Sequence, residues 1–271
     1  MLRRPDTEQK GHWSEVYAGT PAFFGEEPSE FARRALDLFR QEGVETVLEL
    51  GFGQGRDTFW LAEQGFSVTA LDYSDKALAE MVAEAHNKDL GDRITARVHD
   101  VRQPLPYPDD SFDACYSHML LCMELTGTEV AFALREIHRV LKPGRLALYS
   151  VRSDHDKHCG AGTHLGEDVY EVGDFVVHFF SEAKIRRLAR GYHVLAIEPM
   201  EEGSLPRHLY LVTLRQDPDV IPLPIPEEAD MTRPMDKFQE FFDATHQSEV
   251  LDDKTKGLLF LTASLAGGCE L

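Results

Sequence analysis

The stretch VLELGFGQGRDTFWLAEQGFSVTALDYS, residues 47–74, constrains the fold more than any other part of the chain. A short apolar run ends in three alternating glycines, Gly51, Gly53 and Gly55, and an amphipathic helical pattern follows. Glycine permits a sharp turn from a buried strand into a helix and lets the backbone approach a ligand at the helix N-terminus. Asp72 ends the next apolar run, where a carboxylate can bind both hydroxyls of a ribose. These features predict a nucleotide-type site between parallel strands.

The pattern around this turn alternates between strand and helix from residue 29 to residue 215. Such alternation predicts the α/β class with a doubly wound, mostly parallel sheet. The last two apolar runs are joined by a short polar loop and predict an antiparallel hairpin. The strand patterns lie at 47–51, 66–74, 94–100, 112–120, 145–151, 193–200 and 208–215.

Two residues beside the glycines separate the candidate cofactors. Arg56 stands where a dinucleotide-binding fingerprint has its third glycine, which argues against an NAD-type oxidoreductase. Glu49 precedes the first glycine by two positions, and E-x-G-x-G-x-G with the later Asp72 resembles class I methyltransferases that depend on S-adenosylmethionine. The order of elements over 29–215 agrees with that family. The resemblance implies a Rossmann-like seven-stranded sheet, six strands parallel and one antiparallel, with a helical C-terminal appendage.

The resemblance also implies how the cofactor, S-adenosylmethionine, is bound. Glu49 and the glycine turn hold its methionine part, Asp72 holds the ribose, and Asp100 contacts the adenine. His118, at the end of the fourth strand, lies beneath the reactive sulfonium and is a candidate catalytic residue. The implied cofactor-binding residues are Glu49, Gly51, Gly53, Gly55, Asp72, Tyr73, Asp100, Val101 and Ser117.

Residues 1–28 form an N-terminal segment on the expected acceptor side of the sheet. Its motifs W-x3-Y, at Trp13 and Tyr17, and F-G-x-x-P-S resemble a tellurite-resistance and thiopurine-type subgroup. That subgroup acts on small molecules, which suggests a soft sulfur, selenium, tellurium or arsenic acceptor. Trp13 is a candidate substrate contact and Tyr17 a candidate catalytic residue, and their aromatic rings form either a lid or part of the core.

The insert 152–180 follows the fifth strand and contains SDHDKHCGAGTH. Its spacing of histidine, cysteine and aspartate is unspecific for a metal, so we expect no metal. A solvated loop and a substrate contact through Cys159 remain open. Arg152 binds either an anionic substrate or the protein's own carboxylates. His178, in a segment that resembles the relatives' H-x-F-S-E junction, is either a catalytic base or a buried structural histidine.

Beyond residue 215 the composition changes. Residues 216–236 predict a Pro-rich acidic linker. Residues 237–271 predict two helices and resemble the start of a carboxymuconolactone decarboxylase or AhpD-like domain. The redox members of that family have a second cysteine after the position of Cys269, and this chain has none there. We expect the helices to dock on the main domain or to form a homodimer.

Composition limits the partners. The 271 residues carry a formal charge of −19, which repels nucleic-acid backbones and anionic membranes. No apolar run approaches a membrane span, no signal peptide is evident, and four cysteines without a framework pattern indicate the cytoplasm.

The sequence therefore predicts a cytoplasmic methyltransferase that uses S-adenosylmethionine and a small-molecule acceptor. A regulatory or scaffold protein that binds the cofactor and docks through its tail is the alternative, and an NAD-type oxidoreductase is less favoured.

Overall fold

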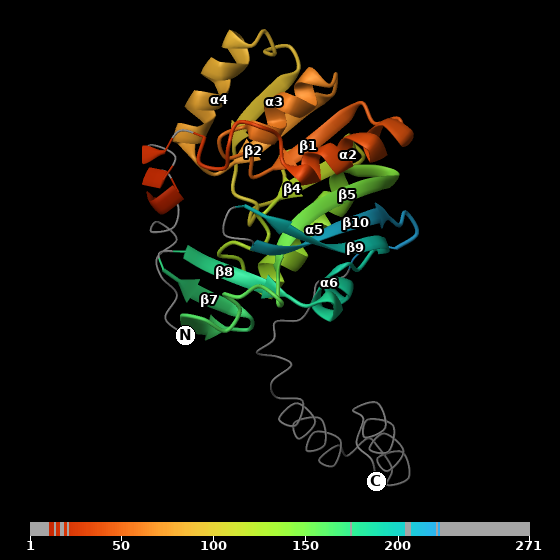
Figure 1. Cartoon of the computed structure of the whole chain (residues 1–271). Helices are drawn as coiled ribbons and strands as arrows, with labels where there is room; N and C mark the ends of the chain where they lie inside the picture. Colours follow the sequence, from red (N-terminus) through yellow and green to blue (C-terminus); the bar gives the residue numbers. More distant parts are fainter. Residues whose placement is uncertain are drawn as a thin grey trace, which may run out of the picture. The chain divides into compact units, whose positions relative to one another are not determined.

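The computed structural model describes residues 11–13, 15–16, 19–20, 22–173, 175–203, 207–220 and 222. Its main feature is a sheet with the strand order β3-β2-β1-β4-β5-β10-β9 (Figure 1). The strands are β1 (Thr46–Leu50), β2 (Ser67–Asp72), β3 (Ile94–Val98), β4 (Phe112–His118), β5 (Leu141–Ser153), β9 (Tyr192–Glu202) and β10 (Arg207–Gln216).

Strand directions agree with the sequence prediction. Strands β1 to β5 are mutually parallel where they pair. Strand β10 is antiparallel both to β5 and to β9, so β9 has the same direction as β1 to β5. The predicted sheet of six parallel strands and one antiparallel strand, with its terminal hairpin, is confirmed for this part of the structure.

In the described part of the chain after residue 22, each helix begins where a side-chain oxygen or a glycine allows the chain to turn. Ser29, Ser74, Thr126 and Ser181 each accept a hydrogen bond from a backbone N–H in the first helical turn, whereas Gly55 precedes α3 without a side-chain cap. The helices are α2 (Glu30–Gln41), α3 (Arg56–Glu63), α4 (Asp75–Asn87), α5 (Gly127–Val140) and α6 (Glu182–Leu188).

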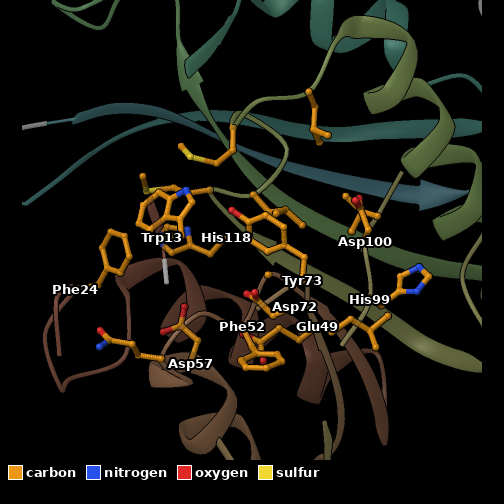
Figure 2. Close-up of a pocket in the computed structure, with 18 of the residues that line it drawn as sticks. Trp13, Phe24, Glu49, Phe52, Asp57, Asp72, Tyr73, His99, Asp100 and His118 are labelled. Carbon is orange, nitrogen blue, oxygen red and sulfur yellow. The ribbon is translucent and has the colours of Figure 1, made fainter. Parts of the chain in front are cut away.

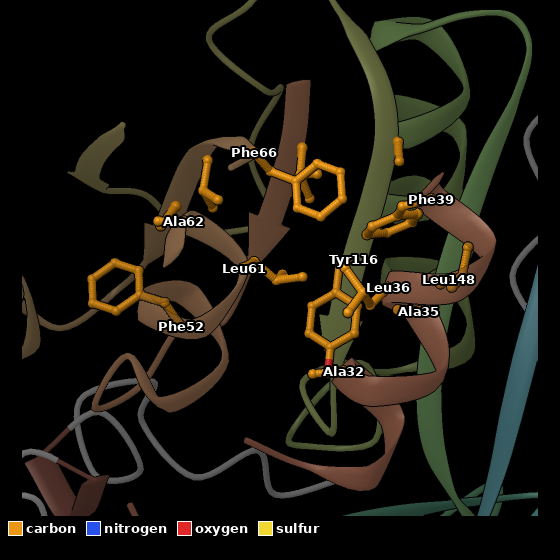
Figure 3. Close-up of a cluster of buried hydrophobic side chains, with 14 of the residues drawn as sticks. Ala32, Ala35, Leu36, Phe39, Phe52, Leu61, Ala62, Phe66, Tyr116 and Leu148 are labelled. Carbon is orange, nitrogen blue, oxygen red and sulfur yellow. The ribbon is translucent and has the colours of Figure 1, made fainter. Parts of the chain in front are cut away.

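The core lies on both faces of the central strands. Tyr116 and Leu148 belong to a buried cluster that includes side chains of α2, α3 and α4 (Figure 3). Tyr149 is equally buried, but strand alternation directs it to the opposite face. On that face Tyr192 donates its hydroxyl to the carbonyl of Leu134 in α5. Burial on both faces explains why β4 is buried from Phe112 to Ser117 and β5 from Leu146 to Ser153, without the alternation of a half-exposed strand.

The insert after β5 is more regular than the sequence indicated. It contains β6 (Thr163–Gly166), β7 (Val169–Val172) and β8 (Phe175–Phe180). Strand β8 joins the end of β5 in parallel, and β7 and β6 add to it in antiparallel order (Figure 1). The C-terminal part of the insert is packed into the protein, because Val176, Val177, Phe179 and Phe180 are buried.

Within the described ranges, no helix has the length and apolar character needed to cross a membrane. The predicted AhpD-like helices at 237–271, the homodimer that they were expected to form and nearly all of the acidic linker lie outside the described residues.

A buried carboxylate, Asp113, fastens the start of β4 to its neighbours. It accepts hydrogen bonds from the backbone N–H groups of Glu45 and Thr46 at 3.1 and 3.0 Å and from Lys142 Nζ at 2.9 Å. Burial raises the pKa of Asp113, but these donors outweigh burial and lower the pKa to about 2. The folded protein therefore favours the ionised carboxylate.

We expect Asp113→Asn to lower the free energy of unfolding at pH 7 by about 2 kcal/mol. Because the folded pKa lies below the unfolded value, this contribution is present above about pH 4 and is lost as the pH falls toward 2. Urea unfolding at pH 7 and pH 3 measures the difference. Asp109→Asn, at an exposed ion pair, is the control, and equal losses in both variants would contradict the assignment.

Candidate functional site

The glycine turn between β1 and α3 is held in place by β2. Gly51 donates its N–H to the carbonyl of Leu71 at 2.7 Å, and Gly53 donates to Asp72 Oδ2 at 2.9 Å. Gly51 and Gly55 have φ angles of +78° and +80°, a region that favours glycine. A Cβ on Gly55 would lie 2.6 Å from Met81 Cε and 2.7 Å from Phe59 Cε2, so a side chain there would force both neighbours to shift.

A pocket opens at the carboxyl ends of β1, β2 and β4, beside this turn (Figure 2). It encloses about 1240 Å³ of space outside protein atoms, including its open mouth. Open parallel sheets bind ligands at this position, outside the carboxyl ends of the strands. The residues that line it include Trp13, Phe24, Glu49, Gly51, Phe52, Arg56, Asp57, Asp72, Tyr73, His99, Asp100, Val101, His118, Met119 and Leu125.

Glu49 is the buried acid of the pocket. Its side chain is 3% exposed, and its Oε2 atom has no hydrogen-bond partner among the described residues. Burial raises the pKa of Glu49 to about 8; the Thr58 hydroxyl beside the carboxyl opposes this rise, and the charges of Asp57 and Asp72 add to it. A buried carboxylate oxygen without a hydrogen-bond partner at a pocket wall is a site for a donor or a cation from a ligand.

The other acids of the pocket are already engaged. Asp72 accepts from Gly53 and from the backbone N–H of Ser74. Asp100 makes a bidentate pair with Arg102, whose Nη2 lies 2.6 Å from Asp100 Oδ2. Burial raises the pKa of Asp100, but Arg102 outweighs it and lowers the pKa. A ligand that uses Asp100 must therefore compete with Arg102.

Aromatic rings form one wall of the pocket. Trp13 is buried and lies 5.2 Å from the ring of Phe175 in β8 and 6.1 Å from the ring of Phe24. The N-terminal segment is thus in contact with the insert, as a lid over an acceptor would be. Phe23 is partly exposed and packs against Phe24. Tyr17 lies outside the described residues.

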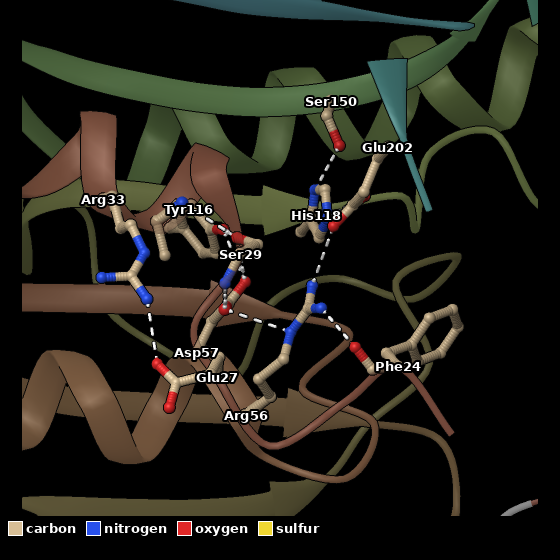
Figure 4. A network of polar contacts seen from close by, with 11 residues as sticks. Phe24, Glu27, Ser29, Arg33, Arg56, Asp57, Tyr116, His118, Ser150 and Glu202 are labelled. Atoms are coloured by element: carbon tan, nitrogen blue, oxygen red, sulfur yellow. Dashed lines mark hydrogen bonds and ion pairs between the residues drawn. The ribbon is translucent and has the colours of Figure 1, made fainter. Parts of the chain in front are cut away.

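A chain of polar contacts crosses the pocket near the end of β4 (Figure 4). Arg56 Nη2 lies 3.3 Å from Glu202 Oε1, and Glu202 Oε2 lies 3.0 Å from His118 Nε2. Burial raises the pKa of Glu202, but His118 and Arg56 lower it to about 2, so Glu202 is ionised and only accepts hydrogen bonds. His118 therefore donates from Nε2 to Glu202, and its Nδ1 lies 2.7 Å from Ser150 Oγ.

A second buried network supports this wall. Asp57 Oδ2 accepts from the hydroxyls of Ser29 and Tyr116, both at 2.7 Å, and Asp57 Oδ1 accepts from the Ser29 N–H (Figure 4). Arg56 donates to the carbonyl of Phe24 at 2.6 Å. Together these contacts join α3, β4, the start of α2 and the aromatic segment, which are far apart in the sequence.

Ser117 and His178 do not line the pocket. Ser117 is fully buried and donates to the carbonyl of Leu50 at 3.1 Å. His178 donates from Nδ1 to the carbonyl of Leu125 at 2.7 Å, and Lys184 donates to its Nε2. Burial and Lys184 lower the pKa of His178 to about 4, so its ring is neutral. This placement favours the structural alternative, in which His178 holds the pocket residue Leu125.

Arg152 and Cys159 also lie away from the pocket. Arg152 Nη2 pairs with the buried Asp156 at 2.8 Å, which is the internal pairing that the sequence left open. Burial raises the pKa of the Cys159 thiol, and nearby carboxylates add to this effect, so Cys159 is a poor nucleophile. Among the residues that the structure describes, no three His, Cys, Asp or Glu side chains are grouped to hold a metal ion.

Sequence reasoning placed Glu49, Asp72, Tyr73, Asp100, Val101 and His118 at one sheet edge, and the structure brings them to one pocket. It missed Glu202, because nothing in the sequence links a hairpin end to a residue some eighty positions earlier. The acidic pair before Gly203 was the available signal, since a charged residue at a tight turn often serves a site.

Comparisons with known proteins agree with this geometry. Residues 47–144 match a family model described as a methyltransferase domain. Phosphoethanolamine N-methyltransferase 1 of Triticum aestivum is 35% identical over 148 residues, which cover 50% of this chain and 28% of that protein. A malonyl-[acyl-carrier protein] O-methyltransferase of Erwinia billingiae is 33% identical over 144 residues, covering 52% of this chain and 50% of that protein. The matched parts of this chain thus span half or less of these curated relatives.

Solved structures share the fold more completely. The 1,6-didemethyltoxoflavin-N1-methyltransferase of Burkholderia thailandensis has a TM-score of 0.63 and 21% identity, covering 80% of this chain and 92% of that one. The CcbJ methyltransferase of Streptomyces caelestis has a TM-score of 0.60 and 17% identity, covering 75% of this chain and 96% of that one. At these identities the likeness shows the fold, which is the Rossmann-like methyltransferase fold.

Arg152 and Asp156 form a buried ion pair at the start of the insert. Asp156→Asn leaves Arg152 buried without its carboxylate, so we expect a loss of about 3 kcal/mol in the free energy of unfolding. Asp154→Asn, beside it but more exposed, is the matched control, and we expect a change within about 0.5 kcal/mol. Urea unfolding at pH 7 measures both, and a small loss for Asp156→Asn would show that the pair does not anchor the insert.

Proposed function

We propose that this chain transfers a methyl group from S-adenosylmethionine to a small-molecule acceptor. The observation that carries the proposal is the Oε2 atom of Glu49, which has no hydrogen-bond partner among the described residues and lies beside a glycine turn in a pocket at the sheet edge. The methyltransferase-domain match over 47–144 and the shared fold support it. The related Burkholderia thailandensis structure contains S-adenosylhomocysteine, the product of such a cofactor.

The residues of the pocket fit the proposed cofactor. Glu49 would hold the ammonium of its methionine part, because that oxygen has no partner among the described residues and the site is buried. The turn 51–55 would let the backbone approach, since a Cβ at Gly51 or Gly55 already meets other side chains. Asp72 would bind the ribose, and Tyr73, Val101 and Asp100 would surround the adenine.

His118 and Glu202 would handle the acceptor's proton. When bound, S-adenosylmethionine supplies a methyl group on a sulfonium, which an acceptor lone pair attacks in line while the sulfur leaves with the bonding electrons. His118 lines the pocket and can take the proton at Nε2 if the acceptor replaces Glu202 there and Ser150 accepts from Nδ1. Ionised Glu202 stabilises the resulting imidazolium.

The order Glu202–His118–Ser150 is also that of a hydrolase triad. Ser150 is fully buried, however, and its Oγ already accepts from the Met119 N–H at 2.9 Å. A substrate cannot reach Ser150 from the pocket, so we assign this chain of contacts to proton handling and not to covalent catalysis.

The chemistry of the acceptor atom can be tested directly. A histidine base suits an N–H or O–H acceptor better than a soft thiolate, which needs little help to ionise. A panel of amine, hydroxyl, thiol, selenide and arsenite acceptors, assayed for S-adenosylhomocysteine formation, separates these classes. Cofactor binding without turnover across the panel would favour the regulatory alternative, and binding of NAD in place of S-adenosylmethionine would favour an oxidoreductase.

We expect the full chain to bind S-adenosylmethionine, and Glu49→Gln to bind it about tenfold more weakly. Because the pKa of Glu49 is about 8, its carboxyl is largely protonated at neutral pH. A cationic ligand favours the ionised carboxylate, so its binding should release the proton of Glu49 into solution. Affinity should therefore rise from pH 6 to pH 8. Calorimetry in two buffers of different ionisation enthalpy measures the proton release.

The variant Glu49→Gln serves as the internal control, because it has no proton to release at this position. Its affinity should vary less with pH than that of the parent chain. If both proteins show the same pH dependence, Glu49 does not hold the cationic end of the cofactor. If neither binds S-adenosylmethionine, the proposed function is wrong.

We expect His118→Gln to lower kcat about 100-fold and Glu202→Gln about tenfold, with the acceptor that the panel identifies. The affinity for S-adenosylhomocysteine should be unchanged, because both residues act on the acceptor side. His155→Gln, with a largely exposed side chain, is the control. Full activity of His118→Gln would exclude its role as a base.

A further inference from the structure

Three arginines from separate elements lie near one another beside the pocket, and of the three Arg56 lines the pocket itself. Arg56 begins α3, Arg152 lies near the end of β5, and Arg207 begins β10. The guanidinium carbons of Arg56 and Arg207 lie 6.0 and 5.7 Å from the centre of the Phe24 ring, which lines the pocket. Arg152 is close enough to Arg207 for their positive charges to repel each other.

The neighbouring carboxylates already have partners. Asp156 pairs with Arg152 at 2.8 Å and accepts from the backbone N–H of His208 at 2.9 Å. Glu202 lies 3.0 Å from His118 and 3.3 Å from Arg56. Two of the three arginines are thus neutralised by the protein's own acids.

Arg207 is the exception. Among the residues that the structure describes, its guanidinium has neither a hydrogen bond nor an ion pair, and its recorded contact is the ring of Phe24. It is partly buried, and burial together with the charges of Arg152 and Arg56 lowers its pKa, although the charges of Glu202 and Asp156 act in the opposite direction. Glu202 and Asp156 already pair with Arg56 and Arg152, so the half-buried guanidinium of Arg207 keeps unused N–H donors that an anionic group of a ligand would satisfy.

We propose that Arg207 binds an anionic oxygen group, carboxylate or phosphate, on the methyl acceptor. The planar guanidinium matches both groups with two parallel hydrogen bonds. The inference rests on the proposed methyl transfer and names the acceptor class: a small organic acid whose body lies against Phe24 and Trp13.

Two further features support this assignment. The chain carries a formal charge of −19, so its overall field repels an anion and a dedicated cation is needed to bind one. Arg207 also lies directly opposite Glu202 in the β9–β10 pairing, and Glu202 contacts His118. The anion anchor and the proton acceptor are therefore neighbours, so the acceptor's nucleophile should lie a short distance from its acid group.

The test uses the full chain saturated with S-adenosylhomocysteine and three matched probes: phenylacetate, phenyl phosphate and phenylacetamide. Calorimetry should show at least one anion binding about tenfold more tightly than the neutral amide. Arg207→Gln should remove that preference and leave amide binding unchanged, and Arg207→Lys should retain part of it. The more tightly bound anion identifies carboxylate or phosphate as the natural group.

Arg215→Gln is the matched control, since it removes one positive charge from the same strand about 26 Å away at 3.3 Å per residue. Anion binding should be unchanged in this variant. If the parent chain shows no preference for the anions, or if Arg207→Gln keeps that preference, Arg207 does not bind an anionic group. Either result would leave the proposed methyl transfer standing. Failure of S-adenosylhomocysteine to bind would instead overturn the proposed function, and the inference with it.

Discussion

The tight turn at 51–55 is the constraint on which the rest of the site depends. Its glycines adopt positive φ angles where a Cβ at Gly51 or Gly55 would strike neighbouring side chains. Hydrogen bonds from Gly51 and Gly53 to the end of β2 fasten it. Because β1 enters helix α3 through so small a turn, the carboxyl ends of β1, β2 and β4 stay open as a pocket, with Glu49 beneath it.

Around that turn, buried polar contacts join elements that are distant in the chain. Asp57 connects α3 to Ser29 and Tyr116, and Arg56 connects it to Phe24 and Glu202. Such contacts are made in a low-dielectric interior, where each unsatisfied partner would be costly. They hold the aromatic segment and the β9–β10 hairpin against the pocket, so the acceptor side is built from both ends of the described domain.

The insert after β5 contributes mainly by position. Its polar opening, which resembled a metal or substrate site in the sequence, is occupied by the internal pair of Arg152 and Asp156. His178 is buried behind the pocket and supports Leu125 from there. Sequence alone cannot separate such structural histidines and arginines from catalytic ones, because the residue type is the same and the partner that decides its role lies elsewhere in the chain.

The sequence by itself determined the local features: the strand and helix periodicities, the glycine turn with Glu49, and the carboxylates at the ends of β2 and β3. Each depends on residues close together in the chain, so spacing and propensity suffice. Only the tertiary structure decided that Glu202 meets His118, that Asp100 is paired with Arg102, and that Arg207 stands beside Phe24. Those relations follow from which strands become neighbours in the sheet, and long-range pairing leaves no periodic signal in a single sequence.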